Sequence, residues 1–185
     1  MWRRGASGDA EAFAAVFDLH RDQVFHQALR LVETWEEAED VAAAAFLELW
    51  RRRRDVRVVG GSVLPWLLVT TANLARNSER ARRRYRDFLV RLPRETRSPD
   101  AAEAMLDGTA TAIDPRLRAA LRALPAKDLH LLLLVAFADH TLADTAAVLG
   151  ISPSAAKNRL QRARARLREQ LDHPESVRSA QEAPR

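Results

Sequence analysis

The sequence predicts an all-α protein built from two small helical domains joined by a flexible linker. Ala, Leu, Arg and Glu dominate the 185 residues, and Gly and Pro are few. Apolar residues recur at steps of three and four over most of the chain, which is the period of an α-helix. Between Pro93 and Pro115 the composition changes to Pro, Ser, Thr, Asp and small residues, as in a linker. The expected divisions are a first domain, a linker, a second domain and a disordered tail, at residues 1–90, 91–115, 116–172 and 173–185.

The first domain is expected to contain three helices, at about residues 9–32, 35–53 and 65–89. Thr34 can cap the second helix, and Glu37 stands three residues later, as in a capping box. The Gly60-Gly61 pair lies in the loop before the third helix, where it allows flexibility or unusual backbone angles. The third helix begins with two apolar turns and continues as a basic helix.

The second domain is expected to contain four helices, at residues 116–124, 127–138, 141–149 and 153–171. The stretch "TLADTAAVLGISPSAAKNRLQRAR" has the layout of a helix-turn-helix. Gly150 stands where the tight turn needs a positive φ angle, and Ile151 fills the junction. Ala146 is small at the point where the two helices would cross. An ordinary αα-hairpin is the alternative interpretation.

The last helix combines an apolar stripe with an opposite face of amides and cations. Ser152 can act as its N-cap and Pro153 as its first residue. A helix of this kind suits the major groove, where Asn, Gln, Lys and Arg contact base edges and phosphates. A solvated basic helix is the simpler alternative. The candidate DNA-contacting residues are Ser154, Lys157, Asn158, Arg159, Gln161, Arg162 and Arg166.

The net charge of +5 conceals a strong asymmetry along the chain. Residues 1–50 carry four Arg against ten Asp and Glu, whereas residues 51–98 carry fourteen Arg against four acidic residues. The basic segment indicates a polyanionic partner such as nucleic acid. The acidic segment indicates either a basic partner or simple solvation.

Several function classes find no support in the sequence. The chain has no Cys, and its five His are scattered outside any hydrolase or metal-ligand motif. We therefore expect a non-enzyme without a cofactor or metal ion. The N-terminus lacks the apolar segment of a signal peptide, and the longest apolar run, residues 131–138, is too short to span a bilayer. The expectation is a cytoplasmic protein without membrane insertion.

Three stretches of the chain resemble a known family. They are "EEAEDVAAAAFLELWRRR", "PWLLVTTANLARNSERARRR" and "ALRALPAKDLHLLLLVAFADHTLADTAAVLGISPSAAKNRLQRARARLREQL". The first two resemble the N-terminal domain, and the third the C-terminal domain, of bacterial RNA polymerase sigma factors of the extracytoplasmic-function class. The N-terminal and C-terminal matches occur in the family's order. Together they are therefore far more specific than a match to one domain alone.

The resemblance implies a role for each segment. The acidic helix would dock on the clamp coiled coil of core RNA polymerase through Glu36, Glu39, Asp40 and Glu48. The loop and the basic helix would hold the −10 promoter element as a single strand, and the last domain would recognise the −35 element and contact the polymerase flap. An anti-sigma factor would be a further partner. The candidate −10 residues are Gly60, Gly61, Ser62, Trp66, Asn73, Arg76, Arg80, Arg83 and Arg84.

The residue types of the −10 set suit a melted strand, because cations bind phosphates and aromatic or flexible pockets accept unstacked bases. Each also has a structural alternative: Trp66 as a core anchor, and Asn73 as a partner of a neighbouring loop. The chain departs from the family pattern at Ala43 and Ala44, where Gln and Glu are usual, and at Leu129, where Arg is common. These departures leave open a degenerate sigma-like protein that only sequesters partners. An ordinary helix-turn-helix regulator is a further alternative, although the acidic-then-basic layout of residues 1–98 argues against it.

Overall fold

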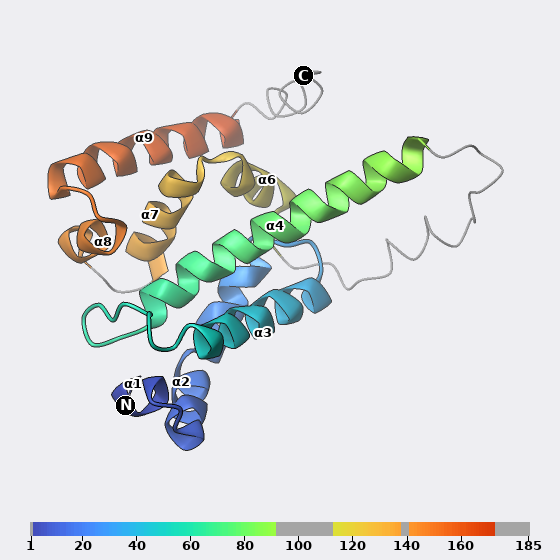
Figure 1. The fold of residues 1–185 in the computed structure, drawn as a ribbon. Helices are drawn as coiled ribbons and strands as arrows, with labels where there is room; N and C mark the ends of the chain where they lie inside the picture. Colours follow the sequence, from blue (N-terminus) through green and yellow to red (C-terminus); the bar gives the residue numbers. More distant parts are fainter. Residues whose placement is uncertain (1, 92–112, 138–140, 173–185) are drawn as a thin grey trace.

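The computed structural model describes residues 2–91, 113–137 and 141–172, and in these ranges it contains helices and no strand. Figure 1 shows the long helix α4 between the remaining N-terminal helices and the C-terminal group. The all-α prediction with a C-terminal helix-turn-helix is confirmed. The helices are α1 (Trp2–Ala6), α2 (Ala10–Leu29), α3 (Trp35–Arg51), α4 (Leu64–Arg91), α6 (Pro115–Ala123), α7 (Ala126–Phe137), α8 (Leu142–Leu149) and α9 (Pro153–Asp172). Residues 92–112 of the predicted linker and the predicted tail lie outside the described residues.

Helix α1 is an element that the sequence pattern did not predict. Five residues are too few to establish a helical period, so only its tertiary contacts reveal its place. Trp2 is buried and packs in the same cluster as Val16 and Phe46. The side chain of Asp9 then caps α2 by accepting a hydrogen bond from the Ala12 amide at 3.0 Å.

Helix α3 begins as predicted, but its capping differs in one detail. Thr34 Oγ1 accepts a hydrogen bond from the Glu37 amide at 3.2 Å. The Glu37 carboxylate accepts from the Glu33 amide at 3.1 Å, one residue before the N-cap. The carboxylate therefore holds the chain that enters the helix, which is an arrangement related to the capping box.

The loop between α3 and α4, residues 52–63, contains a tight two-residue turn. Val59 and Ser62 exchange both backbone hydrogen bonds at 3.0 Å. Gly60 and Gly61 form the turn with φ angles of +58° and +78°, a region that other residues adopt at a cost. The glycine pair therefore allows unusual backbone angles, which is one of the two roles that the sequence predicted for it.

The C-terminal helices follow the predicted limits to within one or two residues. Gly150 ends α8 in the left-handed region with φ +65°, and the Ile151 amide donates to the Ala146 carbonyl at 3.0 Å. Ala156 and Leu160 of α9 pack with Ala146 and Leu131. This is the helix-turn-helix that the sequence predicted.

The largest hydrophobic cluster crosses the boundary between the two predicted domains, and we call it the interdomain core. From the N-terminal part it takes Leu31 in the turn after α2 and Ala72 and Ala75 of α4. From the C-terminal part it takes Leu124, which follows α6, and Leu129 of α7. In this form the two groups of helices share one apolar interior. The buried members are Ala28, Leu29, Leu31, Val32, Ala38, Val41, Ala72, Ala75, Leu121, Leu124, Leu129 and Leu133.

Candidate nucleic-acid interface

The outer face of α9 presents polar and cationic side chains away from the protein. Ala156, Leu160 and Ala163 are buried and hold the helix against its neighbours. The opposite face carries five of the seven predicted DNA-contacting residues in exposed positions. These are Ser154, Lys157, Asn158, Gln161 and Arg162.

The other two predicted residues of α9 have an internal partner. Arg159 and Arg166 both pair with Asp128 of α7, at 3.5 and 2.9 Å. The Asp128 side chain is only 11% exposed, so these cations compensate a carboxylate that is almost out of water. The structure therefore gives both arginines a role in attaching α9 to α7.

The glycine turn lies against a buried histidine. Ser62 Oγ accepts a hydrogen bond from the Leu64 amide at 3.0 Å, which caps the start of α4. His20 Nε2 lies 3.5 Å from the same oxygen, and His20 Nδ1 lies 3.3 Å from Gln23 Oε1. Burial lowers the pKa of His20, while the Gln23 contact raises it by less. The neutral ring thus supports the turn from the side of α2.

The predicted −10 residues follow α4, and the C-terminal helices contact several of them. Trp66 is half-buried and packs against the N-terminal core, which agrees with the structural alternative for most of its ring. Asn73 Oδ1 lies 3.0 Å from His130 Nε2, and Arg76 donates to the Leu124 carbonyl at 2.9 Å. Arg80 is exposed, as are Arg83 and Arg84 nearer the end of α4.

The acidic helix α3 leaves most of its predicted contact residues exposed. Glu36, Glu39 and Asp40 face solvent, although Glu39 accepts a hydrogen bond from Trp35 Nε1 at 3.2 Å. Glu48 is half-buried and pairs with Arg52 one turn later. Leu47 on the same helix is also exposed, with 59% of its surface accessible.

Sequence reasoning missed a network of charges where α4, α6 and the end of α2 meet. Arg82 binds Glu33 at 3.0 Å and also binds Glu37. Arg122 of α6 binds Glu33 at 3.1 Å and Glu79 at 2.9 Å. Partial burial raises the pKa of Glu33, but the two arginines lower it by more, so the net shift is downward. These pairs join residues more than 40 positions apart, so no local pattern could have revealed them.

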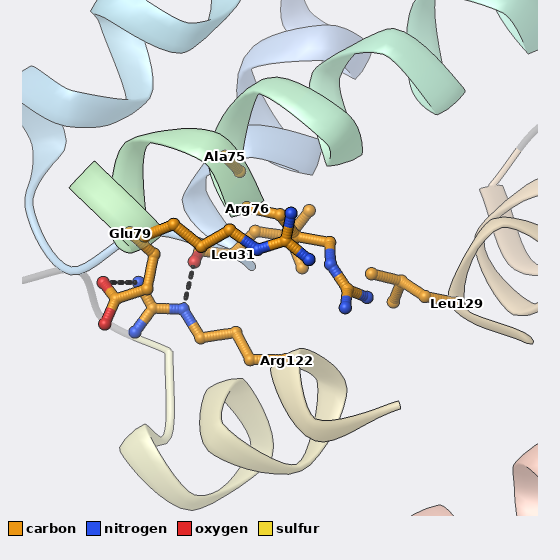
Figure 2. A pocket seen from close by; sticks show the side chains of 7 residues that line it. Leu31, Ala75, Arg76, Glu79, Arg122 and Leu129 are labelled. Atoms are coloured by element: carbon orange, nitrogen blue, oxygen red, sulfur yellow. Dashed lines mark hydrogen bonds and ion pairs between the residues drawn. The ribbon is translucent and has the colours of Figure 1, made fainter. Parts of the chain in front are cut away.

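Beside this network lies a small cavity of about 120 Å³ between α4 and the C-terminal helices. Figure 2 shows Arg122 bonded to Glu79 and to the Leu31 carbonyl, with Arg76 and Leu129 on the neighbouring walls. Arg80 completes the lining. Burial lowers the pKa of the Arg76 guanidinium, and Arg80 lowers it further by repulsion. The cavity is thus bordered by three cations and one carboxylate.

The described residues form no membrane-spanning helix and no cluster of metal ligands. None of the helices in these ranges is both long and apolar enough to cross a membrane. Within the same part of the chain, no three acidic or His side chains converge as metal ligands would.

The fold and this surface define a two-part helical protein with a C-terminal helix-turn-helix. Residues 16–85 match the family described as Sigma-70 region 2, and residues 115–167 match Sigma-70 region 4. The RNA polymerase sigma factor CarQ of Myxococcus xanthus is 30% identical over 168 residues, covering 91% of this chain and 94% of CarQ. The chain belongs to the bacterial RNA polymerase sigma factors of the extracytoplasmic-function class, as the sequence motifs predicted.

A second relative differs in length. The probable RNA polymerase sigma factor RfaY of Xanthomonas campestris is 32% identical over 175 residues, covering 90% of this chain. The chain spans only 42% of the length of RfaY, so RfaY contains sequence with no counterpart here.

Two solved structures share the fold. CnrH in complex with the cytosolic domain of CnrY has a TM-score of 0.58 and 24% identity, over 92% of this chain and 94% of that one. RpoE in complex with the anti-sigma factor NepR from Bartonella quintana has a TM-score of 0.52 and 22% identity, over 88% of this chain and 98% of that one.

Proposed function

We propose that this chain is a promoter-specificity subunit that binds core RNA polymerase, recognises −35 and −10 elements and helps to open the DNA. One observation carries the proposal: a single chain presents both an exposed helix-turn-helix surface and a separate basic helix that follows a tight glycine turn. The first surface suits duplex DNA and the second suits a melted strand. An ordinary duplex-binding regulator needs only the first.

At the −35 element, α9 would enter the major groove with its exposed face. Lys157 and Arg162, which are exposed, would contact guanine edges or phosphates, and the exposed Asn158 and Gln161 would contact adenine edges. Arg159 and Arg166 would act indirectly, since their pairs with Asp128 set the angle of α9 on the domain.

At the −10 element, the strand would follow the turn at Gly60 and Gly61 and the exposed side of α4. Ser62, the edge of Trp66 and Asn73 would contact unstacked bases, and the arginines would bind phosphates. The strand would meet Arg76, Arg80, Arg83 and Arg84 in succession, because these residues lie along one helix.

Protein partners would use the acidic side of the molecule. Helix α3 carries an exposed acidic group that suits a cationic polymerase surface, formed by Glu36, Glu39 and Asp40. Glu48 would join this group once its ion pair with Arg52 is broken. The polymerase flap would contact the C-terminal domain. An anti-sigma factor is a second proposed partner, supported by the solved relative in complex with the anti-sigma factor NepR.

The first test is reconstitution with bacterial core polymerase, scored by co-migration and by run-off transcripts from a pool of genomic fragments. Core binding with new, sequence-specific start sites supports the proposal. Duplex binding without core binding favours the helix-turn-helix regulator, and core binding without transcripts favours the degenerate sigma-like protein.

Variants separate the two DNA surfaces. Lys157→Ala and Arg162→Ala should each cost about 1–3 kcal/mol of binding at the −35 element. Asn73→Ala and Arg80→Ala should impair opening, and premelted promoter DNA should rescue that step only. Arg21→Ala, an exposed arginine on α2, is the matched control. Equal defects of both sets on premelted DNA would contradict this division of roles.

A further inference from the structure

A second and larger cavity lies among the C-terminal helices, between α6, α7 and α9 (Figure 1), and we call it the α6–α9 pocket. Its volume is about 490 Å³, against about 120 Å³ for the cavity beside Arg122. Small-molecule sites are typically clefts of roughly 300–1,000 Å³ with mainly apolar walls and a few polar groups. None of the residues proposed above to contact DNA or polymerase lines this pocket, so those roles do not account for it.

Aliphatic side chains form most of the lining of the α6–α9 pocket. Leu121 of α6 and Leu160 of α9 are buried, whereas Leu117, Leu132 and Leu167 are half-buried. The three half-buried leucines also pack against the interdomain core, which holds them in place. Among the described residues, no aromatic, amide or hydroxyl side chain lines the pocket. It therefore suits a saturated, flexible body without polar atoms of its own.

Two arginines and one aspartate supply the charged part of the lining. Arg30 is the residue that ends α2, and Arg164 is exposed on α9. The Asp114 carboxylate already caps α6, because it accepts a hydrogen bond from the Arg116 amide at 2.8 Å. Two cations against one carboxylate give the pocket a net positive charge, which favours an anionic ligand.

The charge of the pocket also indicates the kind of anion. A guanidinium binds both carboxylate and phosphate groups through paired hydrogen bonds. A carboxylate carries a single charge, which matches the excess of one arginine, whereas a phosphate monoester carries nearly two charges at neutral pH. Burial lowers the pKa of the Arg30 guanidinium, and a carboxylate beside it would offset this effect.

We propose that the α6–α9 pocket binds a fatty acid, with the alkyl chain against Leu117, Leu132 and Leu167 and the carboxylate on Arg30 and Arg164. The inference goes beyond the proposed function, because it concerns a small ligand that neither promoter DNA nor core polymerase supplies. It stands on the aliphatic lining, the volume and the complementary charge together.

An acidic amphipathic peptide helix is the alternative occupant of an apolar pocket with cations. One turn of helix with its side chains occupies roughly 400–600 Å³, from a rise of about 5.4 Å and a width of about 10–12 Å. The α6–α9 pocket, with about 490 Å³, therefore corresponds to about one turn. Docked helices use anchor residues that are spread over two turns or more, so the volume favours the smaller ligand.

The first experiment titrates the full chain with decanoate below its micelle concentration and measures binding by calorimetry. We expect one saturable site. Octanoate should bind about tenfold more weakly, because two methylene groups fewer are buried. The neutral alcohol 1-decanol, which has the same chain length, should also bind about tenfold more weakly, because it cannot pair with the arginines.

A charge variant tests the carboxylate contact. Arg164→Gln should weaken decanoate binding by about tenfold and leave 1-decanol binding unchanged, because only the carboxylate loses a partner. Arg164→Lys should restore part of the affinity. Arg168→Gln removes an exposed arginine one turn further along α9 that does not line the pocket, and it should bind decanoate like the parent.

A second variant blocks the alkyl chain. Ala136 is exposed and lines the pocket, so Ala136→Trp adds a large side chain without replacing a buried one. It should abolish binding of both decanoate and 1-decanol. Ala147→Trp, at an exposed position of α8 outside the pocket, is the matched control and should bind both ligands like the parent. Thermal unfolding without ligand checks that each variant is folded.

Three results would overturn the proposal: no saturable binding of decanoate, equal affinity for decanoate and 1-decanol, or parent-like binding in both Arg164→Gln and Ala136→Trp. The last result would show that the fatty acid adheres to the protein elsewhere. Because the experiment contains neither DNA nor polymerase, each of these results would leave the proposed sigma-factor function standing.

Discussion

Arg122 lies 2.9 Å from Glu79 across the boundary between α6 and α4. The same guanidinium reaches the Leu31 carbonyl and Glu33, so one side chain bonds to α4 and to the turn after α2. Both side chains of the pair are about three-quarters or more out of solvent, which makes the contact stronger than an ordinary surface ion pair. The position of the C-terminal domain thus depends on an arginine that the sequence motifs did not single out.

Leu129→Ala should destabilise the protein markedly. Leu129 is fully buried in the interdomain core, and truncation of such a leucine costs about 2–5 kcal/mol through lost burial and the cavity left behind. Urea unfolding measures the change. Leu47→Ala, at an exposed position of α3, is the control and should change the free energy of unfolding by less than about 0.5 kcal/mol. Equal effects would mean that the interdomain core contributes little.

Gly150→Ala should lower the stability of the helix-turn-helix. The residue has φ +65°, and an L side chain there costs roughly 1–2 kcal/mol, even though the space around it is open. Gly5→Ala is the matched control, since a Cβ there would make ordinary contacts of 3.6 Å in a helix. Thermal unfolding should show a lower Tm for the first variant and an equal or higher Tm for the second. The reverse order would contradict the assigned turn.

Asp128→Asn should loosen the attachment of α9. Asp128 is the shared partner of Arg159 and Arg166, and charge-assisted hydrogen bonds contribute about 1.5–3 kcal/mol each in favourable settings. Because both arginines are partly exposed, we expect a total loss of roughly 1–3 kcal/mol in urea unfolding. The two released cations should also raise nonspecific duplex affinity at low salt. Asp172→Asn, an exposed acid at the end of α9, should do neither.

Stability should fall as the pH drops below about 6.5. Burial, and then repulsion from Arg76, lower the pKa of His130 in the folded protein, and burial also lowers that of His20. In the unfolded chain these histidines take up protons at the ordinary pKa of 6.5, whereas in the folded chain they do so only at lower pH. Because the unfolded state then binds more protons, acid favours unfolding.

Substitutions of the histidines test this origin of the pH dependence. His130→Gln should flatten the profile of unfolding free energy between pH 7 and pH 5, whereas His26→Gln, at an exposed position, should leave it unchanged. A profile that keeps its slope in His130→Gln and His20→Gln together would show that carboxylates alone cause the acid sensitivity.

Local signals in the sequence were sufficient for most of the fold. The period of three and four located α9 to within a residue, because its buried stripe of Ala156, Leu160 and Ala163 follows from helix geometry alone. Gly150 was predictable for the same kind of reason, since only glycine adopts its backbone angles readily. Helix α1 was not predictable, because five residues carry no period.

The residues of the candidate site also fall into two groups: those whose position follows from local sequence and those whose position depends on distant partners. The exposed face of α9 follows from its helical period, so Lys157, Asn158 and Arg162 lie where the sequence placed them. The internal partners of Arg159 and Arg166 depend on Asp128, which is about 30 to 40 residues away along the chain. A helical wheel shows the direction in which an arginine points but contains no information about the helix packed beside it.

The sequence by itself determined the class of this protein: its helices, its helix-turn-helix, its charge asymmetry and its family motifs all depend on residues close together in the chain. Only the tertiary structure decided how the two domains lie. That arrangement depends on Arg122 meeting Glu33 and Glu79, and on Leu129 entering a core beside Ala72 and Ala75. These contacts join segments about 40 to 90 residues apart, and their energies arise only after folding has brought charge to charge and removed water from between apolar side chains.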